Sequence, residues 1–469
     1  MITMSVTRMA ELVGGAVVHG TGDAVITGVG IDTRSMAAGG AFFALPGAHS
    51  DGHEWVPAAF RVGGRAAVVS RWDETMAREA DEAFGGEAAA VLVSDVAEAL
   101  RTLASAHRES LRCPVVGITG STGKTGTKDL VAAALSSKAV VATRGNRNNE
   151  LGVPLTVLEA DGGTDVLIVE MGMRSEGEID MLCAIARPTL GVVTNIGQTH
   201  LESLGSQEAI ARAKGELVAC VPSDGHVFLN GDDEWSRELA SRSLAPVTWY
   251  GLGPDAVVRA TDIEVDAAGR PSLTLVSGSG SARTTLPMPG RHNAYNAAAA
   301  TAVALQLGVP LPEIATLLAT AVTADMRMQV FTAANGVIVV NDAYNANPTS
   351  MRAAIVALSD IGTRGRRIAV LGDMMELGSL SEMAHFTLGE NVARSRVDVL
   401  VTVGERSQRI AEGARAEGMS PASVRPCANA EEASEVLDDL LEPGDVVLVK
   451  ASRSMGLERI VEGILRPHV

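Results

Sequence analysis

The strongest chemical pattern in the chain is a glycine-rich turn between a predicted strand and a predicted helix. The strand is the apolar run 115–118, and helical periodicity begins at Thr127. Glycines let backbone N–H groups close on phosphate oxygens, a lysine reaches the outer phosphates, and a Thr hydroxyl ligates Mg²⁺ at a helix N-terminus. We predict that the turn binds a nucleoside triphosphate. Its predicted contacts are Gly120, Ser121, Thr122, Gly123, Lys124, Thr125 and Gly126.

The turn departs at one position from the usual phosphate-loop pattern G-x-x-x-x-G-K-[ST]. Ile118 stands where the first glycine is expected, and the additional Gly120 lies nearer the lysine. A chance glycine-rich turn is the alternative, but the flanking strand and helix fall where phosphate binding requires them. The chain contains no Asn-Lys dipeptide, so the guanine-reading pattern Asn-Lys-x-Asp is absent, which argues against a GTP-driven switch.

Two further side chains follow predicted strands and could serve a metal ion. Glu170 ends the apolar run 165–169, and ligands of open α/β sheets collect at the carboxyl ends of strands. Glu170 is therefore a candidate Mg²⁺ ligand, and a solvated strand-end carboxylate is the alternative. His200 follows the run 190–193, either as a metal ligand or as a loop histidine without a special role.

Lys214 lies on the apolar side of a predicted helix. Ser206 can cap a helix from Gln207 to Cys220, on which Ile210 and Leu217 share a face with Lys214. A lysine on the inward side is costly unless it is paired or its pKa falls. Two solutions stay open: a salt bridge, which the residues alone favour, or reaction of the neutral amine with CO₂. The resulting carbamate is an anion that could serve a divalent metal.

The composition excludes several classes of protein. Of 469 residues 46% are hydrophobic and 3% aromatic, which predicts aliphatic cores rather than disorder. The 39 Lys and Arg against 56 Asp and Glu give a net charge of −17, which argues against general binding of nucleic acid or anionic membranes. The four scattered cysteines fit a reducing compartment. The chain has no run of about 18 apolar residues, so no membrane span is predicted. We expect a cytoplasmic protein.

The order of predicted elements indicates an α/β protein with three domains. In the first domain, short strand-like runs at 66–70 and 90–94 alternate with turn signals. In the second, continuous apolar runs followed by glycine loops and helical periodicity predict a doubly wound parallel sheet. That domain also contains a predicted antiparallel stretch at 250–286 and a buried, Ala-rich helix at 294–307. The predicted domains are 1–112, 113–325 and 326–469.

The last predicted domain returns to strand–helix alternation. Its apolar runs are short and bounded by turns, as in a sheet covered by helices on both faces. We therefore predict a Rossmann-like α/β sheet. The predicted strands are 337–340, 368–371, 399–403 and 446–449.

Taken together, these residues resemble the Mur ligases, the ATP-dependent amide-bond formers of peptidoglycan synthesis. The segment 290–297 is similar to the family's signature at the start of a central-domain helix. Arg327 resembles the arginine near the hinge to the last domain, although the usual Gly-Arg is Met-Arg here. The resemblance covers nearly the whole chain in the same three-domain order. The other matching motifs are 119–125, Glu170, Thr199-His200 and 213–216.

Three segments resemble the family member that adds D-alanyl-D-alanine to UDP-N-acetylmuramoyl-tripeptide. They are the Asn-rich loop 145–154, the start of the last domain at 341–348 and the strand exit at 371–378. The member that adds the third amino acid also resembles the central domain, but its Asp-Asn-Pro-Arg motif is absent here. Turn chemistry is the alternative for each loop alone, since Asn and Gly favour turns. The implied substrate contacts are Asn146, Asn148, Asn149, Asn345 and Asn347.

The resemblance also implies contacts with nucleotides in each domain. Asp32-Thr33-Arg34 is similar to the uridine-diphosphate contact region, where many relatives carry Asp-Ser-Arg; a plain Asx turn is the alternative. Thr33 and Arg34 are the implied contacts there. For ATP, the implied residues are Asn296, Arg327 and Asp342, the last of which contacts either the ribose or the domain junction.

The chemistry that the resemblance implies is phosphoryl transfer followed by acyl transfer. Lys124, His200 and Lys214 are the implied catalytic residues, with ATP and two Mg²⁺ ions as cofactors. Thr125 and Glu170 are the implied ligands of one ion, and His200 and a carbamylated Lys214 of the other, so His200 serves as a ligand rather than a base. We expect a monomer with a hinge closure that excludes water from the acyl phosphate.

Two alternatives remain beside this assignment. The first is a sister ligase, either the third-residue ligase or a folylpolyglutamate synthase, which acceptor specificity would distinguish. The second is a nucleotide-binding regulator without turnover, against which the intact set of site residues argues.

Overall fold

The structure, a computed structural model, describes residues 1–47, 50–84 and 88–466. Strands and helices alternate along the chain, as predicted for an α/β protein. Within the described residues, none of the helices is long and apolar enough to cross a bilayer. The chain divides into two compact units, one formed by 1–117, 138–173 and 177–191 and the other by 118–137, 174–176 and 192–469.

The N-terminal part contains a five-stranded mixed sheet. Its strand order is β2-β7-β6-β5-β4, with β2 antiparallel to β7 and the other pairs parallel. The predicted runs at 66–70 and 90–94 are the strands β6 (Ala66–Val69) and β7 (Ala89–Leu92). Phe42 and Phe60 lie in the core between this sheet and its helices. The other elements are β1 (Met4–Ser5), α1 (Val6–Val13), β2 (Ala16–His19), β3 (Val25–Ile26), β4 (Val29–Gly30), β5 (Ala41–Phe43), α2 (Val56–Arg61), α3 (Glu74–Phe84) and α4 (Val96–Ser110).

A nine-stranded sheet forms the middle of the chain. Its order is β16-β15-β14-β13-β12-β11-β8-β10-β9, so the first strand of this region, β8, lies between β11 and β10. A first strand in the interior, with later strands added on both sides, is the doubly wound arrangement that the sequence predicts. The strands are β8 (Val115–Thr119), β9 (Val140–Ala142), β10 (Val166–Glu170), β11 (Leu190–Val193), β12 (His226–Asn230), β13 (Val247–Gly251), β14 (Val258–Val265), β15 (Pro271–Ser277) and β16 (Gly280–Thr285).

The predicted antiparallel stretch at 250–286 is confirmed in part. β14, β15 and β16 are antiparallel, but Tyr250 belongs to β13, which is parallel to both β12 and β14. The antiparallel strands therefore extend the main sheet at one edge. The predicted Ala-rich helix is α11 (Asn293–Gln306), which is almost entirely buried. The remaining helices are α5 (Lys124–Ala134), α6 (Gly152–Glu159), α7 (Glu178–Ala186), α8 (Leu201–Leu204), α9 (Gln207–Cys220), α10 (Ser236–Ala240) and α12 (Leu311–Leu318).

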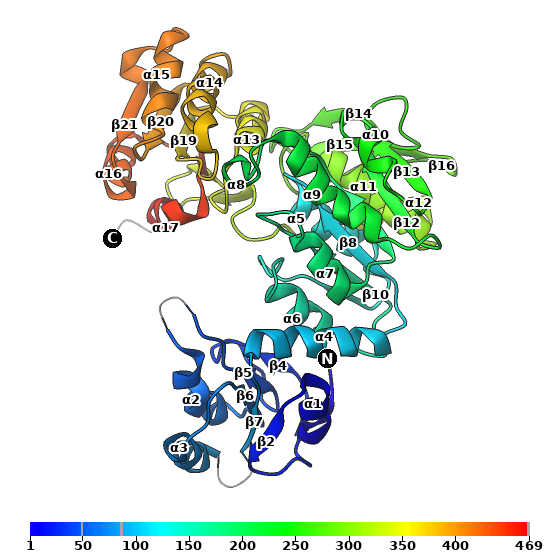
Figure 1. Ribbon diagram of the computed structural model, residues 1–469. Helices are drawn as coiled ribbons and strands as arrows, with labels where there is room; N and C mark the ends of the chain where they lie inside the picture. The colour runs from blue at the N-terminus through cyan, green and yellow to red at the C-terminus, as the bar shows by residue number, and fades with distance from the viewer. Residues whose placement is uncertain (48–49, 85–87, 467–469) are drawn as a thin grey trace. The chain divides into compact units, whose positions relative to one another are not determined.

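The C-terminal part is a six-stranded sheet covered by helices on both faces (Figure 1). Its order is β17-β18-β22-β19-β20-β21, and all pairs except the edge pair β17–β18 are parallel. Alternate residues of β19 face opposite cores: Ala369 and Leu371 contact one, Ile368 and Val370 the other. This explains the continuous apolar runs of the sequence, because both faces are buried.

The same two cores identify the helices on each face of this sheet. Helices α13 (Pro348–Asp360), α14 (Ser381–Ala393) and α15 (Gln408–Ala416) contribute to one core, and α16 (Ala430–Leu440) and α17 (Glu458–Leu465) to the other. The strands are β17 (Gln329–Thr332), β18 (Ile338–Asn341), β19 (Arg367–Gly372), β20 (Val399–Val403), β21 (Val424–Cys427) and β22 (Val446–Lys450).

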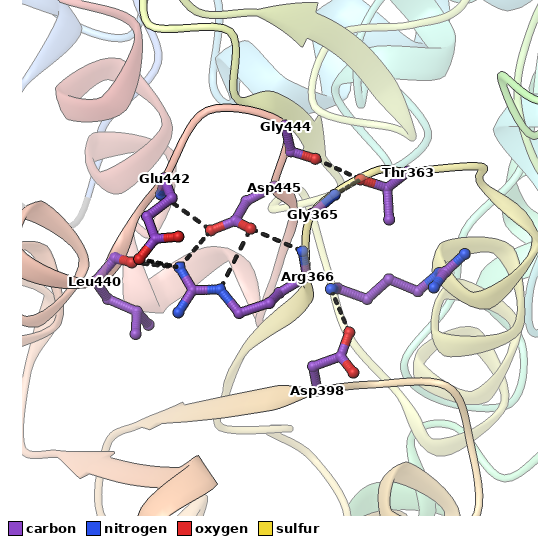
Figure 2. Close-up of polar contacts among 9 residues, drawn as sticks. Thr363, Gly365, Arg366, Asp398, Leu440, Glu442, Gly444 and Asp445 are labelled. Carbon is purple, nitrogen blue, oxygen red and sulfur yellow. Dashed lines mark hydrogen bonds and ion pairs between the residues drawn. The ribbon is translucent and has the colours of Figure 1, made fainter.

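The amino ends of β19 and β22 are joined by an ion pair whose carboxylate is buried (Figure 2). Arg366 and Asp445 immediately precede the two strands, and their side chains are 2.7 Å apart between Nη2 and Oδ2. Asp445 also accepts hydrogen bonds from the backbone N–H groups of Arg366 and Glu442. The pair therefore fixes the register of the two neighbouring strands at their amino ends.

Candidate active site

The glycine-rich turn connects β8 to α5, as the sequence predicts. Because α5 begins directly after Gly123, Lys124 and Thr125 lie in its first turn, where backbone N–H groups favour bound anions. Lys124 Nζ donates to the carbonyl oxygen of Gly120 at 2.6 Å, so the lysine side chain lies along the turn. Ile118 is a fully buried residue of β8. The residue that departs from the usual pattern therefore belongs to the core of the sheet rather than to the turn.

Two glycines of this turn have no room for a side chain. Gly120 has φ = 146°, and a Cβ there would lie 1.8 Å from Thr194 Oγ1. Gly123 has φ = 80°, and a Cβ there would lie 2.8 Å from Asn296 Oδ1. Both residues combine a left-handed backbone with close packing, so the path of the turn depends on them.

The residues after β11 hold the turn in place. Ser121 N donates to the Asn195 carbonyl at 2.9 Å, and Thr122 N donates to Asn195 Oδ1 at 3.0 Å. Thr194 Oγ1 donates to the Thr122 carbonyl at 2.6 Å. Sequence reasoning missed Thr194 and Asn195 as supports, although their position directly after the apolar run 190–193 was a signal.

Glu170 is the last residue of β10, and its side chain is buried with 1% relative exposure. Asn148 Nδ2 donates to Glu170 Oε1 at 2.8 Å, and the backbone N of Glu170 donates to Thr143 Oγ1 at 3.0 Å. The carboxylate is therefore not a solvated strand-end group, and Asn148 fixes its orientation. Asn148 was predicted as a substrate contact, and that role stays a prediction beside this structural one.

The neighbouring asparagines of the Asn-rich loop make local backbone contacts. The carbonyl oxygen of Asn146 accepts from Asn148 N at 2.7 Å. Asn149 Oδ1 accepts from Gly152 N at 3.0 Å, at the first residue of α6. These contacts agree with the turn chemistry left open above, and substrate contacts of Asn146 and Asn149 stay predictions.

Lys214 is buried with 1% relative exposure on α9, whose bounds and Ser206 cap are those predicted. The salt bridge that the residues alone favoured is wrong: within the described part of the chain, Lys214 forms no hydrogen bond or ion pair. Burial, and to a lesser degree the positive charge of Lys124, hold the pKa of Lys214 well below its usual value of 10.5. The neutral amine is the nucleophilic form that carbamate formation requires.

His200 contacts a carboxylate that sequence reasoning did not select. Its Nδ1 lies 2.7 Å from Oε2 of Glu376, in the loop after β19. The hydrogen bond with His200 holds the pKa of Glu376 below its usual value, and burial only partly opposes this. Glu376 belongs to the segment 371–378 that carried the resemblance, which was the available signal.

Asn296 packs α11 against the glycine-rich turn. Its Oδ1 accepts from Thr127 Oγ1 at 3.1 Å, and its Nδ2 donates to Asn293 Oδ1 at 2.9 Å. Since Asn296 also lies against Gly123, it is placed beside the predicted phosphate contacts. Its predicted contact with the nucleotide stays a prediction.

Arg327 lies in a segment with two left-handed residues. Met326 and Met328 have φ = 56° and 52°, and the guanidinium of Arg327 lies 4.2 Å from the centre of the Tyr344 ring. This stacking holds the side chain against the segment that follows β18. The contact of Arg327 with a nucleotide is not tested by this geometry.

Asp342 has partners at both carboxylate oxygens. Oδ1 accepts from Met328 N at 3.2 Å, and Oδ2 accepts from Lys450 Nζ at 2.6 Å. Lys450, which sequence reasoning missed, also donates to the Asn345 carbonyl and is buried at the end of β22. Both contacts lie within the C-terminal part of the chain, and the two roles left open for Asp342 stay predictions.

The remaining predicted substrate residues make local contacts. Asn345 Oδ1 accepts from Ala346 N, and Asn347 forms a capping box with Ser350 at the start of α13. In the first domain, Asp32 accepts from both the backbone and the guanidinium of Arg34, with Thr33 inside the resulting Asx turn. The Arg34 side chain is 88% exposed. The predicted contacts with substrate stay predictions for Asn345, Asn347, Thr33 and Arg34.

The donor groups suit a divalent cation such as Mg²⁺. A Thr hydroxyl and a buried carboxylate, on Thr125 and Glu170, are the oxygen ligands that this ion prefers. Among the described residues no three His, Cys, Asp or Glu side chains gather into a metal-binding group. A second ion at His200 and a carbamate on Lys214 stay predictions.

Family models for the Mur ligases match most of the chain. The Mur ligase family catalytic domain matches residues 25–108, the Mur ligase middle domain residues 118–304, and the Mur ligase glutamate ligase domain residues 326–453. The chain therefore belongs to the Mur ligase family. It is 36% identical to the UDP-N-acetylmuramoyl-tripeptide–D-alanyl-D-alanine ligase of Bacillus subtilis (strain 168), over 99% of each chain.

Solved structures with the same fold come from the same group of enzymes. MurF from Acinetobacter baumannii aligns with a TM-score of 0.85 and 30% identity over 99% of each chain. The MurF ligase of Thermotoga maritima in complex with ADP aligns with a TM-score of 0.77 and 27% identity, over 93% of this chain and 96% of that one. These alignments confirm the three-domain α/β architecture predicted from the sequence.

Proposed function

We propose that this chain is an ATP-dependent, ADP-forming ligase that joins D-alanyl-D-alanine to UDP-N-acetylmuramoyl-tripeptide. The observation that carries the proposal is the similarity over 99% of both chains to a ligase named for that reaction. The ADP complex of a structural relative supports ATP as the nucleotide. The domains 1–112, 113–325 and 326–469 take the UDP substrate, ATP and the dipeptide, respectively.

The first half-reaction activates the terminal carboxylate of the peptide. A carboxylate oxygen attacks the γ-phosphorus of ATP, the bond to the β–γ bridging oxygen breaks, and an acyl phosphate and ADP result. Lys124 and the backbone N–H groups of the first turn of α5 hold the phosphates during this transfer, since a helix N-terminus favours bound anions and Lys124 lies in that turn. Asn296 and Arg327 contact the nucleotide.

The peptide carboxylate and the triphosphate are two anions that must meet, and four residues would hold the divalent ions that suit such a site. When bound, Mg²⁺ spreads the negative charge of the triphosphate and the developing transition state. Thr125 and Glu170 would hold one ion, and His200 and a carbamylated Lys214 would hold the other. Lys214 Nζ adds to the carbon of CO₂ and releases one proton, which gives an N-carboxylate where the unmodified lysine pairs with none of the residues that the structure describes.

The second half-reaction forms the amide bond. The amino nitrogen of D-alanyl-D-alanine attacks the acyl carbon, inorganic phosphate leaves, and the nitrogen loses a proton. Water would hydrolyse the acyl phosphate, so closure of the domains around it favours the amide. The proposed substrate contacts are Thr33, Arg34, Asn146, Asn148, Asn149, Asn345 and Asn347.

The experiment that tests the proposal is ADP release with UDP-N-acetylmuramoyl-tripeptide, Mg²⁺ and ATP, with and without D-alanyl-D-alanine. We expect dipeptide-dependent turnover and a pentapeptide product by mass spectrometry. Lys124→Ala should abolish turnover, whereas Arg415→Ala, on the outer side of α15, should not change it. Turnover with a single amino acid or glutamate in place of the dipeptide would refute the assignment in favour of a sister ligase.

A further inference from the structure

The contact between His200 and Glu376 joins two backbone positions that are unusual for their residue types. His200 has φ = 56° and Glu376 has φ = 62°, both in the left-handed region that non-glycine residues rarely adopt. Their side chains meet at 2.7 Å between Nδ1 and Oε2, with 24% and 51% of the respective side chains exposed. Strained residues persist where the surroundings fix them, and here two of them face each other.

The loop that carries Glu376 is fixed by the residues just before it. Met374 N donates to Nε2 of the fully buried His385 at 2.9 Å, and Met375 N donates to Ser452 Oγ at 2.9 Å. Asp373 Oδ1 accepts from Ser407 N at 2.8 Å. The loop is therefore tied to three other segments of the C-terminal part of the chain and presents Glu376 in a defined position.

The other side of the contact is also close-packed. His200 precedes the short helix α8, and the backbone of Glu202 in that helix lies against Gly378. A Cβ on Gly378 would lie 3.3 Å from the Cα of Glu202. The segments that carry the histidine and the carboxylate are thus packed against each other two residues beyond the contact of the side chains.

An imidazole whose Nδ1–H donates to a carboxylate has its lone pair on Nε2. In metal sites this arrangement orients the ligating histidine and raises its basicity. We propose that Glu376 is a positioning residue that holds the proton of His200 on Nδ1 and leaves Nε2 for the divalent cation bound with ATP. The metal role of His200 rests on the proposed function, whereas the proton position does not.

The proton position can be measured directly on the metal-free protein. Long-range ¹H–¹⁵N spectra of ¹⁵N-histidine-labelled protein, at an alkaline pH where imidazoles are neutral, distinguish the two tautomers. The His200 signals are assigned by their loss in His200→Asn. We expect the proton on Nδ1 in the wild type and in Glu376→Gln, whose side-chain carbonyl can still accept it. In Glu376→Ala we expect a shift of the proton to Nε2. Identical His200 signals in the wild type and Glu376→Ala would overturn the proposal.

Equilibrium binding of Mn²⁺ to the protein with an ATP analogue gives a second readout. Loss of an outer partner of a metal-binding histidine weakens metal affinity on the order of 10-fold, so Glu376→Ala should do so and Glu376→Gln should recover part of the loss. Glu382→Ala, an exposed residue at the start of α14, is the matched control and should change neither measurement. Unchanged affinity in Glu376→Ala would overturn the positioning role. A wild-type chain without dipeptide-dependent turnover would instead refute the proposed function, while the spectra would still decide the proton position.

Discussion

The ion pair at the amino ends of β19 and β22 allows a stability prediction to be worked out atom by atom (Figure 2). Asp445 is 1% exposed and accepts four hydrogen bonds. Two come from the backbone N–H groups of Arg366 and Glu442, at 2.8 and 3.0 Å. Two come from Nε and Nη2 of the Arg366 guanidinium, at 3.3 and 2.7 Å. The perturbation is Asp445→Asn, which keeps the shape of the side chain.

The expected cost follows from the geometry of the donors. An Asn keeps one carbonyl oxygen for the Arg366 backbone, but its NH₂ group must face the N–H donors on the other side. One buried backbone N–H then lacks an acceptor, at about 1–3 kcal/mol, and one charge-assisted bond is lost, at about 1.5–3 kcal/mol. The Arg366 side chain is 31% exposed, so water partly replaces the ion pair and the lower ends apply. We expect a loss of about 3 kcal/mol.

The assay is hydrogen exchange of the amides in β19 and β22, because a chain with several domains does not unfold in two states. A loss of about 3 kcal/mol increases the opening equilibrium roughly 100-fold or slightly more. Asp398→Ala is the matched control: its exposed carboxylate accepts one N–H from Arg367 at 2.7 Å, and water can replace it. Equal exchange in the two variants, or unchanged exchange in Asp445→Asn, would refute the reasoning.

The pH dependence provides an independent check of the same pair. Burial raises the pKa of Asp445, but the hydrogen bonds from Arg366 outweigh it, so the pKa in the folded state lies below the usual 3.8. The unfolded state therefore binds the proton first as the pH falls. The stabilisation is complete above pH 3.8 and is lost as the pH falls through the folded pKa. The difference between wild type and Asp445→Asn should shrink in that range and stay constant between pH 5 and 8.

Three further predictions concern the candidate site. Gly120→Ala places a Cβ 1.8 Å from Thr194 Oγ1, so we expect ATP affinity to fall more than 10-fold, measured by calorimetry; unchanged affinity would mean that the turn can shift freely. Lys214→Met removes a buried amine and should abolish turnover. The variant protein should unfold at the same or a higher denaturant concentration than the wild type, and a large loss of stability would show that the amine does have a partner. Asn347→Ala removes the cap of α13 and should cost about 1 kcal/mol in the opening free energy of that helix, measured by hydrogen exchange, whereas a substrate contact requires a higher KM for the dipeptide.

The sequence predicted most accurately the features that local periodicity encodes. The helix from Gln207 to Cys220 has its predicted bounds because Ser206 caps it directly, and the buried strand β8 lies within one residue of its predicted end. Of the antiparallel stretch predicted at 250–286, only the part from β14 onward is antiparallel. Tyr250 was assigned to it wrongly, because strand direction depends on the neighbouring strand rather than on the residues of the strand itself.

The functional residues that sequence reasoning missed share one property: they act on a partner far away in the chain. Glu376 contacts His200 across 176 positions (376 − 200), and Asn195 supports the turn at Ser121. No periodic pattern or short motif encodes such pairs. The same holds for Lys450, whose partner Asp342 directly follows a different strand of the same sheet, β18.

By itself, the sequence determined the chemistry available to this protein: a strand–turn–helix with glycines and a lysine for phosphate, and the family to which the chain belongs. These follow from residue types at short, fixed spacings. Only the tertiary structure decided which groups are isolated and which are paired. It buried Lys214 where none of the described residues pairs with it, placed Glu376 on His200 and occupied both oxygens of Asp342. Burial and pairing depend on neighbours brought together from distant parts of the chain, and such neighbours cannot be read from local spacing.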